Sequence, residues 1–155
     1  MKPGTEVRYR ILPYMAVPSA ERNHLLVVDD DPDLRDLLQQ VLTEEGYRVE
    51  TATDGLMALK SLRVGPLPRL ILLDVMMPRM DGWQFCEARQ LSPELRSIPI
   101  VLISAHAGPS RVAPYSRIAA VLSKPFGLDE VIRTVHRFAY SVTEASGKAA
   151  SPSEN

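Results

Sequence analysis

Short apolar runs recur along the middle of the chain, and each one ends at a polar or charged side chain. These runs lie at 24–28, 69–73, 99–103 and 119–123. None of them alternates strictly with polar residues, which is typical of strands buried on both faces of a parallel sheet. A fifth segment, 47–51, alternates like a half-buried strand. The pattern therefore predicts five strands.

Helical periodicity fills most of the stretches between these strands. The first expected helix begins after Asp31 and stops at Gly46, and the second begins at Asp54. The third runs from Gly82 or Trp83 to about Leu91, where Pro93 ends it, and the last spans 128–141. Strands that alternate with helices favour a doubly wound α/β fold, in which helices cover both faces of a parallel sheet.

One helix of this alternation is poorly supported. Between Ser104 and Val121, the residues Gly108, Pro109 and Pro114 interrupt the chain. Proline removes a backbone donor and clashes with the preceding helical turn, so little room is left for a regular helix. We expect an atypical, short fourth helix here.

The two ends of the chain differ from the middle. Residues 1–22 show no sustained period and read as a flexible N-terminal extension, within which Met15 is an alternative start. Small and polar residues dominate 142–155, which predicts a disordered tail. A single domain is therefore expected at 23–141.

Composition narrows the possible functions. The 155 residues carry a formal net charge of -1, which gives no general attraction to nucleic acid or to anionic membranes. The single cysteine, Cys86, excludes an intrachain disulfide and a cysteine-based zinc site. No apolar run approaches the ~20 residues that span a bilayer. We expect a cytoplasmic protein that contacts neither nucleic acid nor membrane directly.

Polar side chains stand where the apolar runs end. They are Asp29, Asp30, Asp31, Asp74, Ser104 and Lys124. The carboxyl ends of parallel strands share one edge of the sheet, where ligands bind. One aspartate suffices to cap a helix, whereas crowded carboxylates repel one another and call for a cation. Oxygen ligands suit Mg²⁺ or Mn²⁺.

These groups are the parts needed for phosphoryl transfer to a carboxylate. Asp74 would attack phosphorus, while Lys124 and a cation would neutralise the phosphoryl oxygens and Ser104 would donate a hydrogen bond to one of them. Such chemistry depends on positioning and charge more than on covalent machinery.

Four segments in order carry a family resemblance: 27–31, 72–82, 101–105 and 123–126. Through them the chain resembles a response-regulator receiver domain of two-component signalling, over about residues 23–140. The resemblance implies a flavodoxin-like five-stranded sheet of order 2-1-3-4-5. It also implies a phosphoacceptor signalling domain, not an enzyme in the ordinary sense, that catalyses its own phosphotransfer and slow autodephosphorylation.

The resemblance assigns roles residue by residue. Asp29 and Asp30 form the acidic pair, with Asp30 the direct metal ligand. Asp74 accepts the phosphoryl group and also belongs to the metal site, which the Met76 backbone carbonyl completes. Ser104 is the switch hydroxyl, and Lys124 precedes Pro125 through a cis peptide bond. The phosphoryl donor would be a sensor histidine kinase or a phosphotransfer protein, and the signal would pass to a downstream protein.

Three positions bear on how the signal is timed and transmitted. Met76 and His106 lie two residues past the phosphoacceptor and the switch hydroxyl, where they would flank the path of the hydrolytic water and modulate dephosphorylation. Val121 occupies the switch position, three residues before the lysine, where the family usually has tyrosine or phenylalanine. The usual transmission route is therefore not expected to operate unchanged.

Two other functions compete with a stand-alone phosphoacceptor receiver. A phosphorylation-independent interaction module would retain the fold, as Val121 and the short fourth helix favour. A haloacid-dehalogenase-like phosphatase would use Asp29 and Asp31, which fit its spacing formally, but it would give Asp74 no role. A nucleotide-binding P-loop is excluded because its glycine-rich motif is missing.

Overall fold

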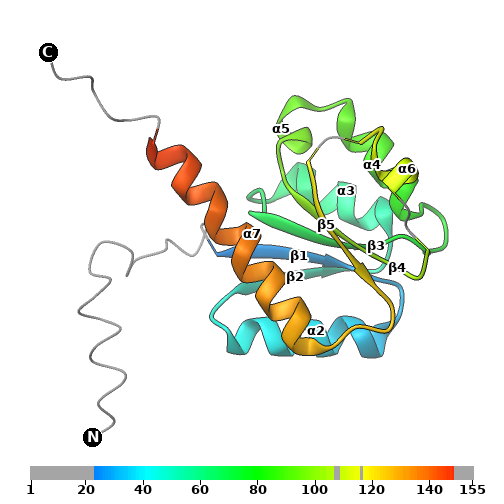
Figure 1. Ribbon diagram of the computed structural model, residues 1–155. Helices are drawn as coiled ribbons and strands as arrows, with labels where there is room; N and C mark the ends of the chain where they lie inside the picture. The colour runs from blue at the N-terminus through cyan, green and yellow to red at the C-terminus, as the bar shows by residue number, and fades with distance from the viewer. Residues whose placement is uncertain (1–22, 107–108, 116, 149–155) are drawn as a thin grey trace, which may run out of the picture.

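The computed structural model describes residues 23–106, 109–115 and 117–148. Its five strands are β1 (His24–Val28), β2 (Arg48–Ala52), β3 (Leu70–Asp74), β4 (Ile100–Ser104) and β5 (Ile118–Ser123). All neighbouring strands are parallel, and they form one sheet in the order β2-β1-β3-β4-β5 (Figure 1). The flavodoxin-like order is confirmed.

Helices cover both faces of this sheet (Figure 1). They are α2 (Pro32–Glu44), α3 (Gly55–Val64), α4 (Gly82–Gln90), α5 (Pro93–Arg96), α6 (Pro109–Val112) and α7 (Leu128–Lys148). Buried side chains of α2 and α7 share a cluster with one face of the strands, and those of α3 and α4 share a cluster with the other. Within the described residues, no helix is both long and apolar enough to cross a membrane.

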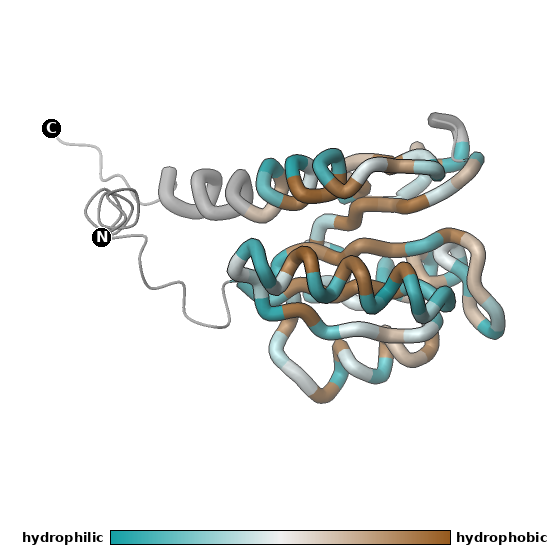
Figure 2. The backbone as a smooth tube through the Cα atoms, turned by 90° about the horizontal axis from the view of Figure 1, so that it is seen from below, coloured by the Kyte–Doolittle hydropathy of each residue, from teal (hydrophilic) through white to brown (hydrophobic). Residues whose placement is uncertain are grey.

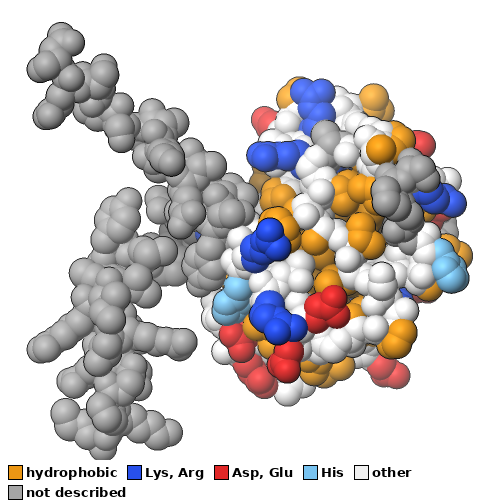
Figure 3. Space-filling view, viewed as in Figure 1, with side chains coloured by type: hydrophobic (Ala, Val, Ile, Leu, Met, Phe, Trp, Pro, Cys, Tyr) orange, Lys and Arg blue, Asp and Glu red, His pale blue; other side chains and the backbone are white. Residues whose placement is uncertain are grey.

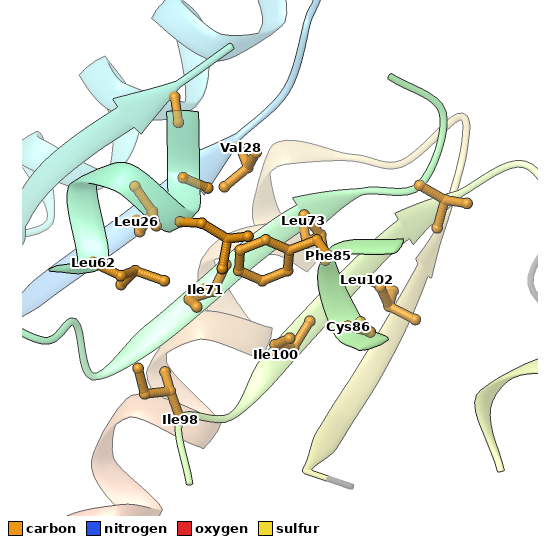
Figure 4. Packing of buried hydrophobic residues seen from close by; sticks show 14 residues of the cluster. Leu26, Val28, Leu62, Ile71, Leu73, Phe85, Cys86, Ile98, Ile100 and Leu102 are labelled. Atoms are coloured by element: carbon orange, nitrogen blue, oxygen red, sulfur yellow. The ribbon is translucent and has the colours of Figure 1, made fainter. Parts of the chain in front are cut away.

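Successive strand residues point into opposite clusters, as the two-residue period of a strand requires. In β3, Ile71 and Leu73 belong to the α3–α4 side, whereas Leu70 and Leu72 belong to the α2–α7 side. Figure 4 shows Phe85 of α4 lying against Ile71 and Leu73. Burial on both faces explains why the apolar runs do not alternate in the sequence.

The helix α2 follows the expected start and stop signals. Asp31 caps it by accepting hydrogen bonds from the N–H groups of Asp33 (3.0 Å) and Leu34 (3.4 Å), and Pro32 occupies its first turn. Gly46, beyond its end, has φ +96°, a conformation that glycine adopts without steric cost. Hydrophobic and hydrophilic residues alternate along α2 at helical spacing (Figure 2).

The structure corrects several element boundaries. Pro93 does not merely end α4, because it opens the one-turn helix α5. The last helix continues past the expected end at 141 to Lys148, since each residue added to an existing helix gains a hydrogen bond. The segment where the sequence predicted a short, atypical fourth helix, between β4 and β5, forms the single turn α6. The predicted extension 1–22, with Met15, and residues 149–155 lie outside the described residues.

Candidate functional site

Two neighbouring strands bring the acidic residues together. Val28 of β1 pairs with Leu73 of β3, so Asp29 and Asp74, the next residues along, meet at the same edge of the sheet. Carboxylate oxygens of Asp29, Asp30 and Asp74 lie within 4.8 Å of one another. We call these three residues the acidic pocket.

Burial differs sharply among the three carboxylates. Asp29 and Asp74 are 0% and 3% exposed, whereas Asp30 is open to solvent. Burial, followed by the negative charge of Asp29, raises the pKa of Asp74 to about 6. Burial also raises the pKa of Asp29, although the Asp31 N–H and Lys124 oppose the effect. The pocket concentrates negative charge where water solvates it poorly.

Backbone groups orient the buried carboxylates. Asp29 Oδ1 accepts a hydrogen bond from the Asp31 N–H (2.9 Å), and Asp74 Oδ1 accepts one from the Met76 N–H (3.3 Å). Asp29 Oδ2 is buried and has no hydrogen-bond partner within the described residues. A buried carboxylate oxygen without a donor, beside two further carboxylates, fits a hard divalent cation such as Mg²⁺ or Mn²⁺.

Lys124 approaches the pocket from the end of β5. Its Nζ lies 3.5 Å from Asp74 Oδ1, and its peptide bond to Pro125 is cis, as expected. Ser104 and Ser123 are paired in the sheet, and the Lys124 N–H donates to the Ser104 carbonyl (3.1 Å). Strand pairing therefore places the ammonium group beside the carboxylate that the sequence singled out.

Ser104 lies at the end of β4, next to β3, and is 5% exposed. Its Oγ accepts a hydrogen bond from the His106 N–H (3.0 Å), which ties the hydroxyl to the segment that follows. The exposed side chain of Met76 (74%) lies one residue beyond Val75, in the loop after β3. His106 is likewise exposed.

The loop from β3 to α4 approaches the backbone closely at one glycine. A Cβ atom at Gly82 would lie 2.7 Å from the Asp74 carbonyl oxygen and 2.8 Å from Val75 Cα. The Gly82 N–H donates to the Val75 carbonyl (2.8 Å). Only glycine lets α4 begin this close to the end of β3.

Sequence reasoning identified Asp54 only as a helix start, and it assigned Arg79 no role. Asp54 is 0% exposed and does cap α3, because its Oδ1 accepts a hydrogen bond from the Met57 N–H (2.9 Å). It also forms an ion pair with Arg79 of the β3–α4 loop. Nothing in the spacing of these two residues signals that contact.

The raised pKa of Asp74 has a consequence for stability. When the pKa of an aspartate is higher in the folded protein than in the unfolded chain, its contribution to the free energy of unfolding is fully present at a pH below the unfolded pKa. That contribution is lost as the pH rises through the folded pKa. Between about pH 4 and pH 7, the metal-free protein should lose up to about 3 kcal/mol of unfolding free energy relative to Asp74→Asn. Urea unfolding of both proteins, with a chelator present, measures this difference. Parallel pH profiles would contradict the prediction.

Comparisons with known proteins agree with this geometry. A family model described as "Response regulator receiver domain" matches residues 25–136. The "Response regulator MprA" of Mycobacterium sp. (strain KMS) is 43% identical over 110 residues, which cover 70% of this chain and 46% of the relative. The protein of the same name from Mycolicibacterium vanbaalenii is 39% identical over 125 residues, covering 79% and 53%. The chain thus spans about half the length of these relatives.

Solved structures show the same fold. The chemotaxis response regulator CheY4 of Vibrio cholerae superposes with a TM-score of 0.67 at 29% identity, covering 74% of this chain and 97% of that one. A response regulator from Chloroflexus aurantiacus gives a TM-score of 0.68 at 29% identity, with coverage of 76% and 98%.

Proposed function

Because this chain belongs to the response regulator receiver domain family, we propose that Asp74 accepts a phosphoryl group from a phosphohistidine. The donor is a sensor histidine kinase or a phosphotransfer protein. The observation that carries the proposal is the surroundings of Asp74, a buried strand-end carboxylate 3.5 Å from Lys124 Nζ and within 4.8 Å of Asp29 and Asp30.

In the proposed reaction, an oxygen of Asp74 forms a bond to phosphorus while the bond from phosphorus to the imidazole nitrogen breaks. Lys124 neutralises charge on the phosphoryl oxygens, and the Ser104 hydroxyl donates a hydrogen bond to one of them. Asp29, Asp30, Asp74 and the Met76 backbone carbonyl would hold Mg²⁺, which would supply further positive charge to the same oxygens. At neutral pH, above its pKa of about 6, Asp74 is mostly ionised and can act as the nucleophile.

The most direct test uses acetyl phosphate as a small phosphoryl donor with Mg²⁺ present. Intact mass should increase by one phosphate, and the increase should disappear with a chelator. Absence of any added phosphate would favour the competing function, a phosphorylation-independent interaction module. The stand-alone arrangement stays a prediction, which the size of the protein in extracts of its native cells would test.

The lifetime of the phosphorylated form is expected to depend on Met76. Its side chain is 74% exposed and provides no strong hydrogen bond to orient a water molecule, so it should hinder attack instead. The half-life of the phosphorylated protein should therefore exceed that of phosphorylated Met76→Asn by about tenfold. This is less than the rate enhancement that a well-positioned catalytic group typically gives. Loss of the added mass over time, after removal of the donor, measures both rates. Equal rates would show that Met76 does not set the lifetime, and His106→Ala tests the other flanking position in the same assay.

A second contact network suggests where the signal leaves the domain. The ring of Tyr115 stacks on Trp83 of α4 at 5.6 Å with an interplanar angle of 24°, and its hydroxyl lies 3.4 Å from Glu87. The Arg111 guanidinium lies 5.1 Å above the Trp83 ring. Val121, like Trp83 and Tyr115, packs against the buried cluster on the α3–α4 side of the sheet, but it contributes no ring. Figure 3 shows hydrophobic side chains gathered over β5, between α6 and α7.

Phosphorylation is therefore expected to alter the segment 105–118 more than the strand around Val121. If the Ser104 hydroxyl turns toward the phosphoryl group, it releases the His106 N–H and loosens the segment that ends at Tyr115. Trp83 is the only tryptophan, so its fluorescence should change on phosphorylation, and Ser104→Ala should suppress that change. Hydrogen exchange provides the independent readout. Changes confined to β5, with 105–118 silent, would contradict the prediction.

A further inference from the structure

In the proposed function, the loop from β3 to α4 presents the Met76 backbone to the acidic pocket. The side chains of Met77 and Met80 in this loop are only partly buried against the core. The base of the loop is held by the Val75 N–H, which donates to the Ile103 carbonyl (3.1 Å), and by the Gly82 N–H, which donates to the Val75 carbonyl (2.8 Å). Met76 and Arg79, between them, are exposed. Contacts with a neighbouring element therefore add to this partial packing in holding the tip of the loop.

That neighbour is the N-terminus of α3. Arg79 of the loop forms an ion pair with the buried carboxylate of Asp54 through Oδ2. The other oxygen, Oδ1, accepts a hydrogen bond from the Met57 N–H. Burial alone would raise the pKa of Asp54, but the Met57 N–H and the Arg79 guanidinium together hold it below the ordinary value. The ion pair is therefore favourable at neutral pH.

Backbone geometry makes the same contact. The Gly55 N–H donates to the Met80 carbonyl (3.2 Å), and a Cβ atom at Gly55 would lie 2.6 Å from Met80 Cγ and 3.0 Å from that carbonyl oxygen. Arg79 adopts φ +65°, which is uncommon for any residue except glycine. The ion pair with Asp54 offsets part of this backbone cost.

We propose that Asp54 and Arg79 are positioning residues, whose ion pair holds the tip of the β3–α4 loop on α3 so that the Met76 carbonyl faces the acidic pocket before the cation binds. The inference rests on the proposed function, because it assigns the loop a part in binding Mg²⁺. Such preorganisation strengthens binding, since the cost of ordering the loop is met during folding and not when the ligand binds.

Charge and positioning predict opposite effects of one substitution. Arg79→Gly removes a positive charge from the loop that follows Asp74, so electrostatics alone would strengthen Mg²⁺ binding. Loss of positioning would weaken it, by about tenfold if the pair acts like other groups that orient metal ligands. Glycine also accepts φ +65° freely, so this variant should fold.

Isothermal titration of the full chain with Mg²⁺ gives the test. Asp54→Asn keeps an oxygen that can cap α3 and loses the charge, so it should weaken binding as Arg79→Gly does. The double variant should bind no more weakly than the weaker single variant, because the two residues act as one unit. Arg63→Gln, at an exposed arginine in the last turn of α3, removes the same charge as Arg79→Gly and should leave the affinity within about twofold.

Hydrogen exchange at residues 76–81 of the metal-free protein gives a readout that does not depend on Mg²⁺. Exchange should be faster in both single variants than in the unmodified protein. If the unmodified protein binds Mg²⁺ and the variants bind it equally well, the positioning role is refuted while the proposed function stands. If the unmodified protein binds no Mg²⁺, the proposed function fails. Hydrogen exchange at 76–81 that is the same in the variants as in the unmodified protein would then separately refute the role of the ion pair in holding the loop.

Discussion

Replacement of Asp74 by asparagine is expected to abolish Mg²⁺-dependent phosphorylation of this protein. Asparagine has nearly the same shape but lacks an ionisable oxygen that can bond to phosphorus. Asp74 is the strand-end carboxylate that lies beside Lys124 Nζ, at 3.5 Å, while also facing Asp29 and Asp30. Intact mass after incubation with acetyl phosphate should therefore show no added phosphate in the variant.

The control for this experiment is the fold. Because Asp74 is 3% exposed and carries a carboxylate whose burial raises its pKa, the variant should be at least as stable as the metal-free unmodified protein at neutral pH. A folded Asp74→Asn protein that gains phosphate as fast as the unmodified one would overturn the assignment. Asp31→Asn serves as the matched variant, since asparagine keeps the cap of α2 and the backbone N–H that donates to Asp29, so labelling should stay intact.

Replacement of Asp30 by alanine is expected to remove the response to Mg²⁺ altogether. Asp30 is the exposed member of the acidic pocket, so its side chain contributes little to the core and a great deal to the charge that attracts a cation. The melting temperature of the unmodified protein should rise with Mg²⁺, whereas that of the variant should not. Phosphorylation should be lost with the metal.

In the metal-free state the same substitution should be neutral or slightly stabilising, because it removes one of three crowded like charges. Asp33→Ala gives a matched loss of an acidic residue, in the first turn of α2, that is not one of the three carboxylates of the pocket. An unchanged Mg²⁺-induced shift in Asp30→Ala would show that Asp30 is not a ligand. A shift lost equally in Asp33→Ala would point to general surface charge instead.

Much of the architecture could be predicted from local patterns. Strand positions followed from apolar runs, and the start of α2 followed from Asp31 and Pro32. These features are local, because a cap or a buried strand imposes its residue types on neighbours in the sequence. The end of α7 was predicted wrongly because no residue near 141 is a local stop signal for a helix. The end was placed there only because the composition beyond it suggested disorder.

Contacts between distant segments could not be predicted in this way. Arg89 on α4 is fully buried, and its Nη1 donates to the carbonyls of Leu95 (3.2 Å), Arg96 (3.0 Å) and Ile98 (2.8 Å). An arginine on a short helix is ordinarily expected at the surface. Leu56 on α3 shows the converse, because this large apolar side chain is 48% exposed.

For the candidate site, the sequence by itself determined which residues end the strands, because strand order and chain direction bring those ends to one edge of the sheet. Only the tertiary structure decided how those residues act on one another. The pKa of Asp74 depends on burial and on the charge of Asp29, and the pair of Asp54 with Arg79 joins two separate loops. Electrostatic and hydrogen-bonding effects depend on distances in space, which a one-dimensional pattern does not contain.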